Sequence, residues 1–323
     1  MRQLQFEAEH AAEWTEFEKF LDDPRGSGKA PPFDPAEMPA RYRRVCQSLA
    51  LAADRQYSPA LVDRLNGLAL RGHHALYRNR RRQSQQVLEF IVAGFPALVR
   101  SEWRLVLAAG LLFFGPLLGL IAILQAFPEF VHYLLAPEQI ASFHQMYDPG
   151  NRRLGTREAD SSLLMFGFYI WNNVRIGFQT FAGGLLFGVG SIWFLGSNGV
   201  VIGAVAGYLT QVGFNQTFWS FVAGHSSLEL LAIVLSGAAG LRLGLAVIAP
   251  GGLSRRAALV AAAKPAVRVM YGAAVMFFAA AFVEAFWSPL TEIPYQIKIG
   301  AGITGWAILL AYFLFVGRAS ATR

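Results

Sequence analysis

The chain has 323 residues, 54% of them hydrophobic and only 15% charged, with a formal net charge of +7. This balance indicates a membrane protein. Its basic residues are expected to meet lipid headgroups, which argues against a nucleic-acid-binding protein. The single cysteine, Cys46, excludes both a disulfide within the chain and a metal cluster built on several thiolates.

Residues 1–104 are predicted to form a cytoplasmic helical region. The apolar face of a first helix is expected to contain Trp14, Phe17 and Leu21. Asp34 followed by Pro35 is typical of an N-cap and the first turn of a second helix. Ser58 and Pro59 repeat this start signal for a third helix. We therefore expect a small helical cap in front of the membrane segments.

The stretch 85–95 is apolar but too short to cross a bilayer. We expect it to lie along or against the membrane surface as an interfacial helix. Pro96 is expected to end this helix, because proline cannot continue one from its interior.

Residues 105–323 are predicted to form a transmembrane domain. Its apolar runs are 105–127, 176–195, 219–248, 267–287 and 297–316, with a shorter one at 200–212. The shorter run contains Thr210 and Gln211, so it is the weakest candidate for a transmembrane helix among the six runs. Counting it gives a bundle of about six transmembrane helices.

The orientation of the bundle follows from the distribution of positive charge. The basic loop is expected to stay in the cytoplasm and consists of Arg255, Arg256, Lys264 and Arg268. Arg100 and Arg104 hold the start of the first span on the same side, so an even number of crossings must separate them from that loop. Four crossings satisfy this condition, place both termini in the cytoplasm and make 128–162 an extracytoplasmic connection.

Glycines recur every four residues on two of the predicted helices. They are Gly199, Gly203 and Gly207 on one, and Gly240 and Gly244 on the other. Small residues at this spacing let helix backbones approach closely in lipid, so we expect these helices to form a tight core. A hinge for gating is the alternative interpretation of the same glycines.

The most informative polar residues are His225 and Glu229, which are four residues apart within an apolar run. On a helix both side chains lie on one face, and an acidic group at mid-membrane depth must turn away from lipid. Asn172 or Asn173, before the second span, and Glu284, near the outer end of the fifth, are predicted at the same level. We therefore expect an intramembrane polar cluster.

Such a cluster has several interpretations. A structural hydrogen-bonded network is favoured, and a proton or substrate site in a transport cavity is the main alternative. His225 is the only histidine within a predicted span, so we expect no metal or other cofactor, and an intramembrane metalloenzyme is the least favoured option. No phosphate-binding loop, nucleophile elbow or kinase motif is present, and no catalytic residue is assigned.

Four segments carry a family resemblance: NNVRIGFQTFAGGLLFGVG, SNGVVIGA, GHSSLELLAIVLSGAAGLRLG and FVEAFWSP. In this order they resemble the stage II sporulation protein M family of bacterial integral membrane proteins. The stretch DRQYSPALVDRLNGLALRGHHALY also resembles the cytoplasmic portion of longer members. The positions that match the family motif are Asn172, Asn173, Asn198, Gly199, His225, Glu229, Gly240 and Glu284.

The resemblance implies a multi-pass protein of the bacterial inner membrane. The namesake works with two other membrane-anchored proteins in cell-wall remodelling during sporulation, as an assembly component. Longer members from bacteria that do not sporulate are often associated with ATPases of the MoxR type. We therefore expect a non-enzymatic scaffold of a membrane or cell-envelope complex, forming a homo-oligomer; the alternative is a transporter, channel or lipid-handling protein.

Overall fold

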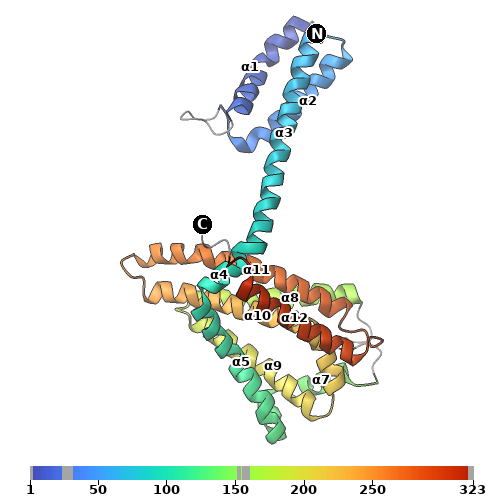
Figure 1. The fold of residues 1–323 in the computed structure, drawn as a ribbon, viewed down its shortest axis with the longest axis vertical. Coiled ribbons are helices and arrows are strands. Elements are labelled where there is room, and N and C mark those ends of the chain that lie inside the picture. The colour runs from blue at the N-terminus through green and yellow to red at the C-terminus, as the bar shows by residue number, and fades with distance from the viewer. Residues whose placement is uncertain (1–2, 24–31, 151–153, 155–160, 319–323) are drawn as a thin grey trace. The chain divides into compact units, whose positions relative to one another are not determined.

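The computed structural model describes residues 3–23, 32–150, 154 and 161–318. The fold is all-helical, with helices α1 to α12 and four short helical segments in the described part. The chain forms two compact units, 1–89 and 90–323, each with its own packed interior (Figure 1).

The first unit contains α1 (Gln3–Asp22), η1 (Pro35–Glu37), α2 (Met38–Asp54) and α3 (Pro59–Glu89). Its core includes Phe6, Trp14, Phe17, Phe20, Val45, Leu65 and Leu68. The predicted apolar face of α1 is therefore the packed one. Asp34 acts as an N-cap as predicted, because its Oδ1 accepts a hydrogen bond from the amide of Ala36 at 2.9 Å.

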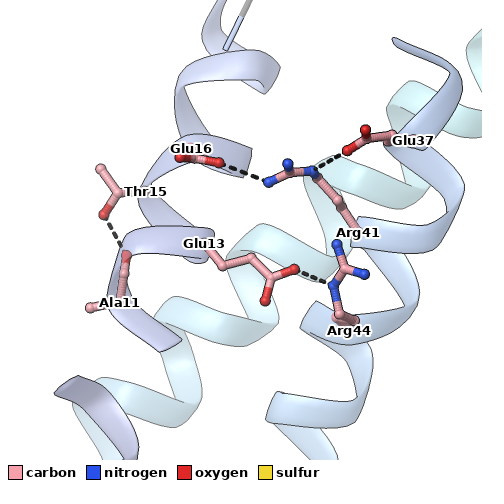
Figure 2. Close-up of polar contacts among 7 residues, drawn as sticks. All are labelled: Ala11, Glu13, Thr15, Glu16, Glu37, Arg41 and Arg44. Carbon is pink, nitrogen blue, oxygen red and sulfur yellow. Dashed lines mark hydrogen bonds and ion pairs between the residues drawn. The ribbon is translucent and has the colours of Figure 1, made fainter. Parts of the chain in front are cut away.

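Ion pairs connect α1 to the start of α2 (Figure 2). The Arg41 guanidinium lies between Glu16, at 2.8 Å, and Glu37, at 3.1 Å, while Arg44 pairs with Glu13. These pairs are partly exposed, so each contributes about 0.2–1 kcal/mol at most. Their main effect is to fix the register of α1 against α2, whereas stability comes from the aromatic core.

The segment around Pro96 differs from the prediction. Pro96 does not end a helix; it lies in the first turn of α4 (Phe95–Ser101), where its missing amide proton removes no helical hydrogen bond. A π-helical turn, η2 (Phe90–Gly94), connects α3 to α4. Phe95 is buried against Gly272, where a Cβ atom would lie 2.1 Å from its ring. The turn is therefore continuous with the packed second unit.

The second unit is built around α10 (Figure 1). Its elements are α4, α5 (Trp103–Ala126), η3 (Pro128–Phe130), α6 (Val131–Leu134), α7 (Pro137–Tyr147), α8 (Ser162–Ala182), η4 (Gly183–Leu185), α9 (Val189–Gln211), α10 (Asn215–Ile248), α11 (Arg255–Phe286) and α12 (Tyr295–Phe315). Helix α10 packs against α11, α12, α8, α5 and α9, and α5 pairs along its length with α9. The apolar core therefore surrounds α10.

Five helices of the described part are long and apolar enough to cross a membrane: α5, α9, α10, α11 and α12. The run 200–212, the shortest in the sequence, belongs to the continuous helix α9 of 23 residues. The run 176–195 is not one helix, because the chain turns between Gly183 and Gly188, and Gly188 has φ +79°. The second predicted span is therefore divided between α8 and α9.

Glycine stripes bring helix backbones together as their spacing predicts. Cβ atoms on Gly199 and Gly203 would lie 2.3 Å from Phe113 O and 2.6 Å from Leu117 O of α5, and Gly207 faces Leu124. On α10, a Cβ on Gly240 would lie 2.2 Å from Ser191 Oγ, and one on Gly244 would lie 2.4 Å from Gly188 N. Side chains are excluded at these crossings, which favours close dispersion contacts.

One end of the second unit gathers several basic side chains. The Arg100 guanidinium donates hydrogen bonds to the carbonyls of Phe313 and Val316, each at 2.8 Å, so the end of α4 is fastened to the end of α12. Arg242, near the end of α10, forms an ion pair with Glu102 at the α4–α5 junction. The first and last long helices thus begin and end at the same side.

Candidate functional site

Three of the predicted polar residues meet between α10 and α11. One ligand-type atom each of His225, Glu229 and Glu284 lies within 4.8 Å of the others. His225 and Glu229 are adjacent because they are one turn apart on α10, and His225 Nε2 lies 3.7 Å from Glu229 Oε2. Glu284 reaches them from α11, which packs against α10. We call these three residues the polar cluster.

Two residues outside the predicted set, Ser288 and Lys298, lie next to the polar cluster. Ser288 Oγ lies 3.0 Å from His225 Nδ1, and its carbonyl accepts a hydrogen bond of 2.7 Å from Lys298 Nζ. Ser288 is fully buried and Lys298 is 1% exposed. The loop after α11 therefore links His225 to the first turn of α12. A lysine inside an otherwise apolar run was the available sequence signal.

Aromatic side chains pack around His225 at one side of the polar cluster. The Phe221 ring makes an edge contact with the His225 imidazole at 5.5 Å between centroids, and Tyr147 of α7 packs on Phe221. Burial raises the pKa of the Tyr147 hydroxyl, and the neighbouring carboxyl groups of Glu284 and Glu229 raise it further. Trp287 covers Gly224 so closely that a Cβ there would lie 2.3 Å from the indole.

The two asparagines have different environments. Asn172 accepts a hydrogen bond of 3.4 Å from Arg175, whose guanidinium lies 4.8 Å from the Trp171 ring centroid. Asn173 is 1% exposed, and neither its amide nitrogen nor its amide oxygen has a hydrogen-bond partner among the residues that the structure describes. It lies one turn before Gly177, whose face packs on Phe277 of α11 and Ser236 of α10. The structure thus places Asn173, not Asn172, toward the α10–α11 seam.

The arrangement is chemically simple. An imidazole and two carboxyl groups can exchange hydrogen bonds, share a proton or bind a cation, and the low dielectric of the interior strengthens each of these interactions. Glu284 Oε2 is shielded from solvent and has no hydrogen-bond partner within the described ranges, so these contacts leave one strong acceptor unused. A pocket lies elsewhere, between Val99, Glu102 and Arg242.

A bundle of long apolar helices that encloses ionisable side chains defines a multi-pass membrane protein. The family model for stage II sporulation protein M matches residues 105–289, which include all four segments that carry the resemblance. The chain therefore belongs to the stage II sporulation protein M family. A second family model, described as a domain of unknown function (DUF8413), matches residues 4–78. No curated protein and no solved structure matches the chain.

Proposed function

We propose that the protein is a non-enzymatic scaffold or assembly component of a membrane or cell-envelope complex, and that its polar cluster holds the helices together. The observation that supports this role is the enclosure of His225. His225 is 4% exposed, bonds Ser288 through one ring nitrogen and faces Glu229 with the other. A transport site needs access from water or lipid, whereas these contacts favour a network that fixes α10, α11 and the loop before α12.

We further propose that both termini are cytoplasmic and that α8 is a sixth membrane-embedded pass. Arg100, Arg242 and the C-terminal end of α12 lie at one side of the unit, and Arg268 of α11 lies over the Phe90 ring just before α4. By the positive-inside rule this side faces the cytoplasm. Helix α8 ends beside Gly240, where η4 contacts α10. The C-terminal ends of α8 and α10 then lie at the same side of the unit, so six passes would alternate in direction.

The partners we propose follow from the two units. The apolar helix faces of the second unit are expected to contact lipid and a second copy of the chain. The first unit presents a charged helical surface over its own core, suited to recruiting a partner such as a MoxR-type ATPase. Assembly, rather than turnover of a substrate, is then the activity to measure.

One observation favours the alternative of a transporter or lipid-handling protein. Asn173 and Glu284 Oε2 are buried without partners, and such groups often mark a polar path in a membrane protein. A path of this kind would require α8 to move relative to α10 and α11, opening the seam beside Asn173.

A pair of histidine substitutions tests the scaffold role. His225→Ala removes the bond to Ser288 and leaves buried groups unpaired, so we expect a loss of about 1–3 kcal/mol in unfolding free energy and weaker assembly. His132→Ala, on the exposed side of α6, is the control and should have no effect. Thermal unfolding and light scattering of the detergent-solubilised protein measure both properties. A His225→Ala protein that folds and assembles normally but no longer moves a solute across liposomes would refute the proposal.

A further inference from the structure

The polar cluster has the composition of a metal site. It offers one imidazole nitrogen and two carboxylate oxygens, from two neighbouring helices. A Zn²⁺ ion held at about 2.0–2.2 Å by each ligand requires ligand atoms about 3–3.5 Å apart. His225 Nε2 and Glu229 Oε2 are already 3.7 Å apart, and the full set lies within 4.8 Å. Side-chain rotation that moves each ligand atom by about 1 Å would therefore bring the set to binding distance, with no movement of the helices.

The electrostatics of the cluster favour a cation. Glu229 and Glu284 bring two carboxyl groups together inside an apolar bundle, where like charges repel strongly. In the described part of the chain, the ion-pair partner of these groups within 4.0 Å is the His225 imidazole. Lys298 instead donates to the Ser288 carbonyl. A bound cation would neutralise both carboxylates directly.

Two unpartnered groups give independent support. In the part of the chain that the structure describes, Glu284 Oε2 is buried and accepts no hydrogen bond, so one oxygen of a cluster carboxylate is unused. Asn173 is buried with an equally unused amide oxygen, on the face of α8 that packs on the α10–α11 seam. Buried polar atoms in native proteins normally have a partner, and a bound ion is one of the few partners that would satisfy an acceptor in such a place.

We propose that His225, Glu229 and Glu284 bind a single divalent transition-metal cation of the Zn²⁺ class, which joins α10 to α11. The imidazole nitrogen selects such a metal over Mg²⁺ or Ca²⁺, which prefer oxygen ligands alone. Ser288 holds His225 Nδ1 and leaves Nε2 free, as partners of metal-binding histidines do. The inference rests on the proposed structural role of the cluster, to which it adds the cation.

Metal binding can be measured on the full-length protein in detergent. After chelator treatment, the protein is titrated with ZnCl₂, the bound metal is counted by mass spectrometry, and thermal unfolding is recorded. We expect about one Zn²⁺ per chain and a higher unfolding temperature with Zn²⁺ but not with Mg²⁺. Glu284→Gln should weaken binding at least about tenfold, and Glu138→Gln, the same change at an exposed site on α7, should not.

A measurement on the unaltered protein keeps the test independent of how the variants fold. Co²⁺ at the proposed site should give the visible absorption bands of a cobalt centre with a low coordination number. Addition of ZnCl₂ should abolish these bands. Substoichiometric Zn²⁺, absent Co²⁺ bands or an unchanged unfolding temperature would each overturn the inference. If His225→Ala still destabilised the chelator-treated protein, the structural role of the cluster would stand without the metal.

Discussion

The glycines of α9 offer a graded test of how closely α5 and α9 pack. A Cβ atom at position 199 would lie 2.3 Å from the Phe113 carbonyl oxygen, and real Cβ atoms essentially never approach closer than 3.0 Å. Gly199→Ala therefore forces the two backbones apart by about 0.7 Å or more, the difference between these two distances. Overpacking of this kind typically costs about 1–3 kcal/mol, so we expect a loss of that size in unfolding free energy.

The contacts of Gly203 and Gly207 predict the order in which the alanine variants lose unfolding free energy. At Gly203 the nearest atom is the Leu117 carbonyl oxygen at 2.6 Å, whereas at Gly207 it is the tip of the Leu124 side chain at 2.9 Å, which can rotate away. The expected loss thus falls from Gly199→Ala to Gly203→Ala to Gly207→Ala. Gly196→Ala is the matched control, because no atom lies within 4 Å of its Cβ, and alanine favours the helix by up to about 1 kcal/mol.

The assay is equilibrium unfolding in mixed micelles with a rising fraction of denaturing detergent, followed by tryptophan fluorescence. The reasoning would be refuted if Gly199→Ala and Gly196→Ala unfolded at the same midpoint, or if the order of the three interface variants were reversed. Either result would mean that α5 and α9 are not in backbone contact at these positions.

Two further predictions concern other parts of the chain. Glu102→Gln and Arg242→Gln should be coupled by about 1–2 kcal/mol in a double-mutant cycle, because their ion pair is partly buried; additive effects would contradict the contact. Asp34→Ala removes the cap of η1 and should cost about 1 kcal/mol. Hydrogen exchange should then speed up at the start of α2, with α10 as the internal reference, and unchanged exchange would mean that the cap does not matter.

The membrane helices show how far composition predicts this fold. Long apolar runs identify α5, α10, α11 and α12, because a bilayer demands length and apolarity and both are local properties. The turn between α8 and α9 cannot be predicted from length and apolarity. Its residues are as apolar as the helices it joins. Its backbone distinguishes it, because Phe187 (φ +55°) and Gly188 (φ +79°) both lie in the left-handed region.

Some contacts in the candidate site follow from the local sequence, and others depend on tertiary packing. The proximity of His225 and Glu229 follows from helix periodicity alone. Ser288 and Lys298 meet only because the loop after α11 folds back onto the start of α12, a contact that helix periodicity does not predict. Tyr147 comes from a connection whose packing against Phe221 no spacing rule describes. Tertiary docking, not residue type, decides these positions.

The hydrogen bonds from Arg100 to the end of α12 have a consequence for synthesis. Arg100 is synthesised before all five candidate membrane spans, whereas the carbonyls of Phe313 and Val316 are made at the end of the last one. Until then this guanidinium lacks both acceptors, and α4 lacks its hydrogen bonds to the end of α12. A chain truncated within the last helix would therefore keep a guanidinium without these two partners at the end of α4.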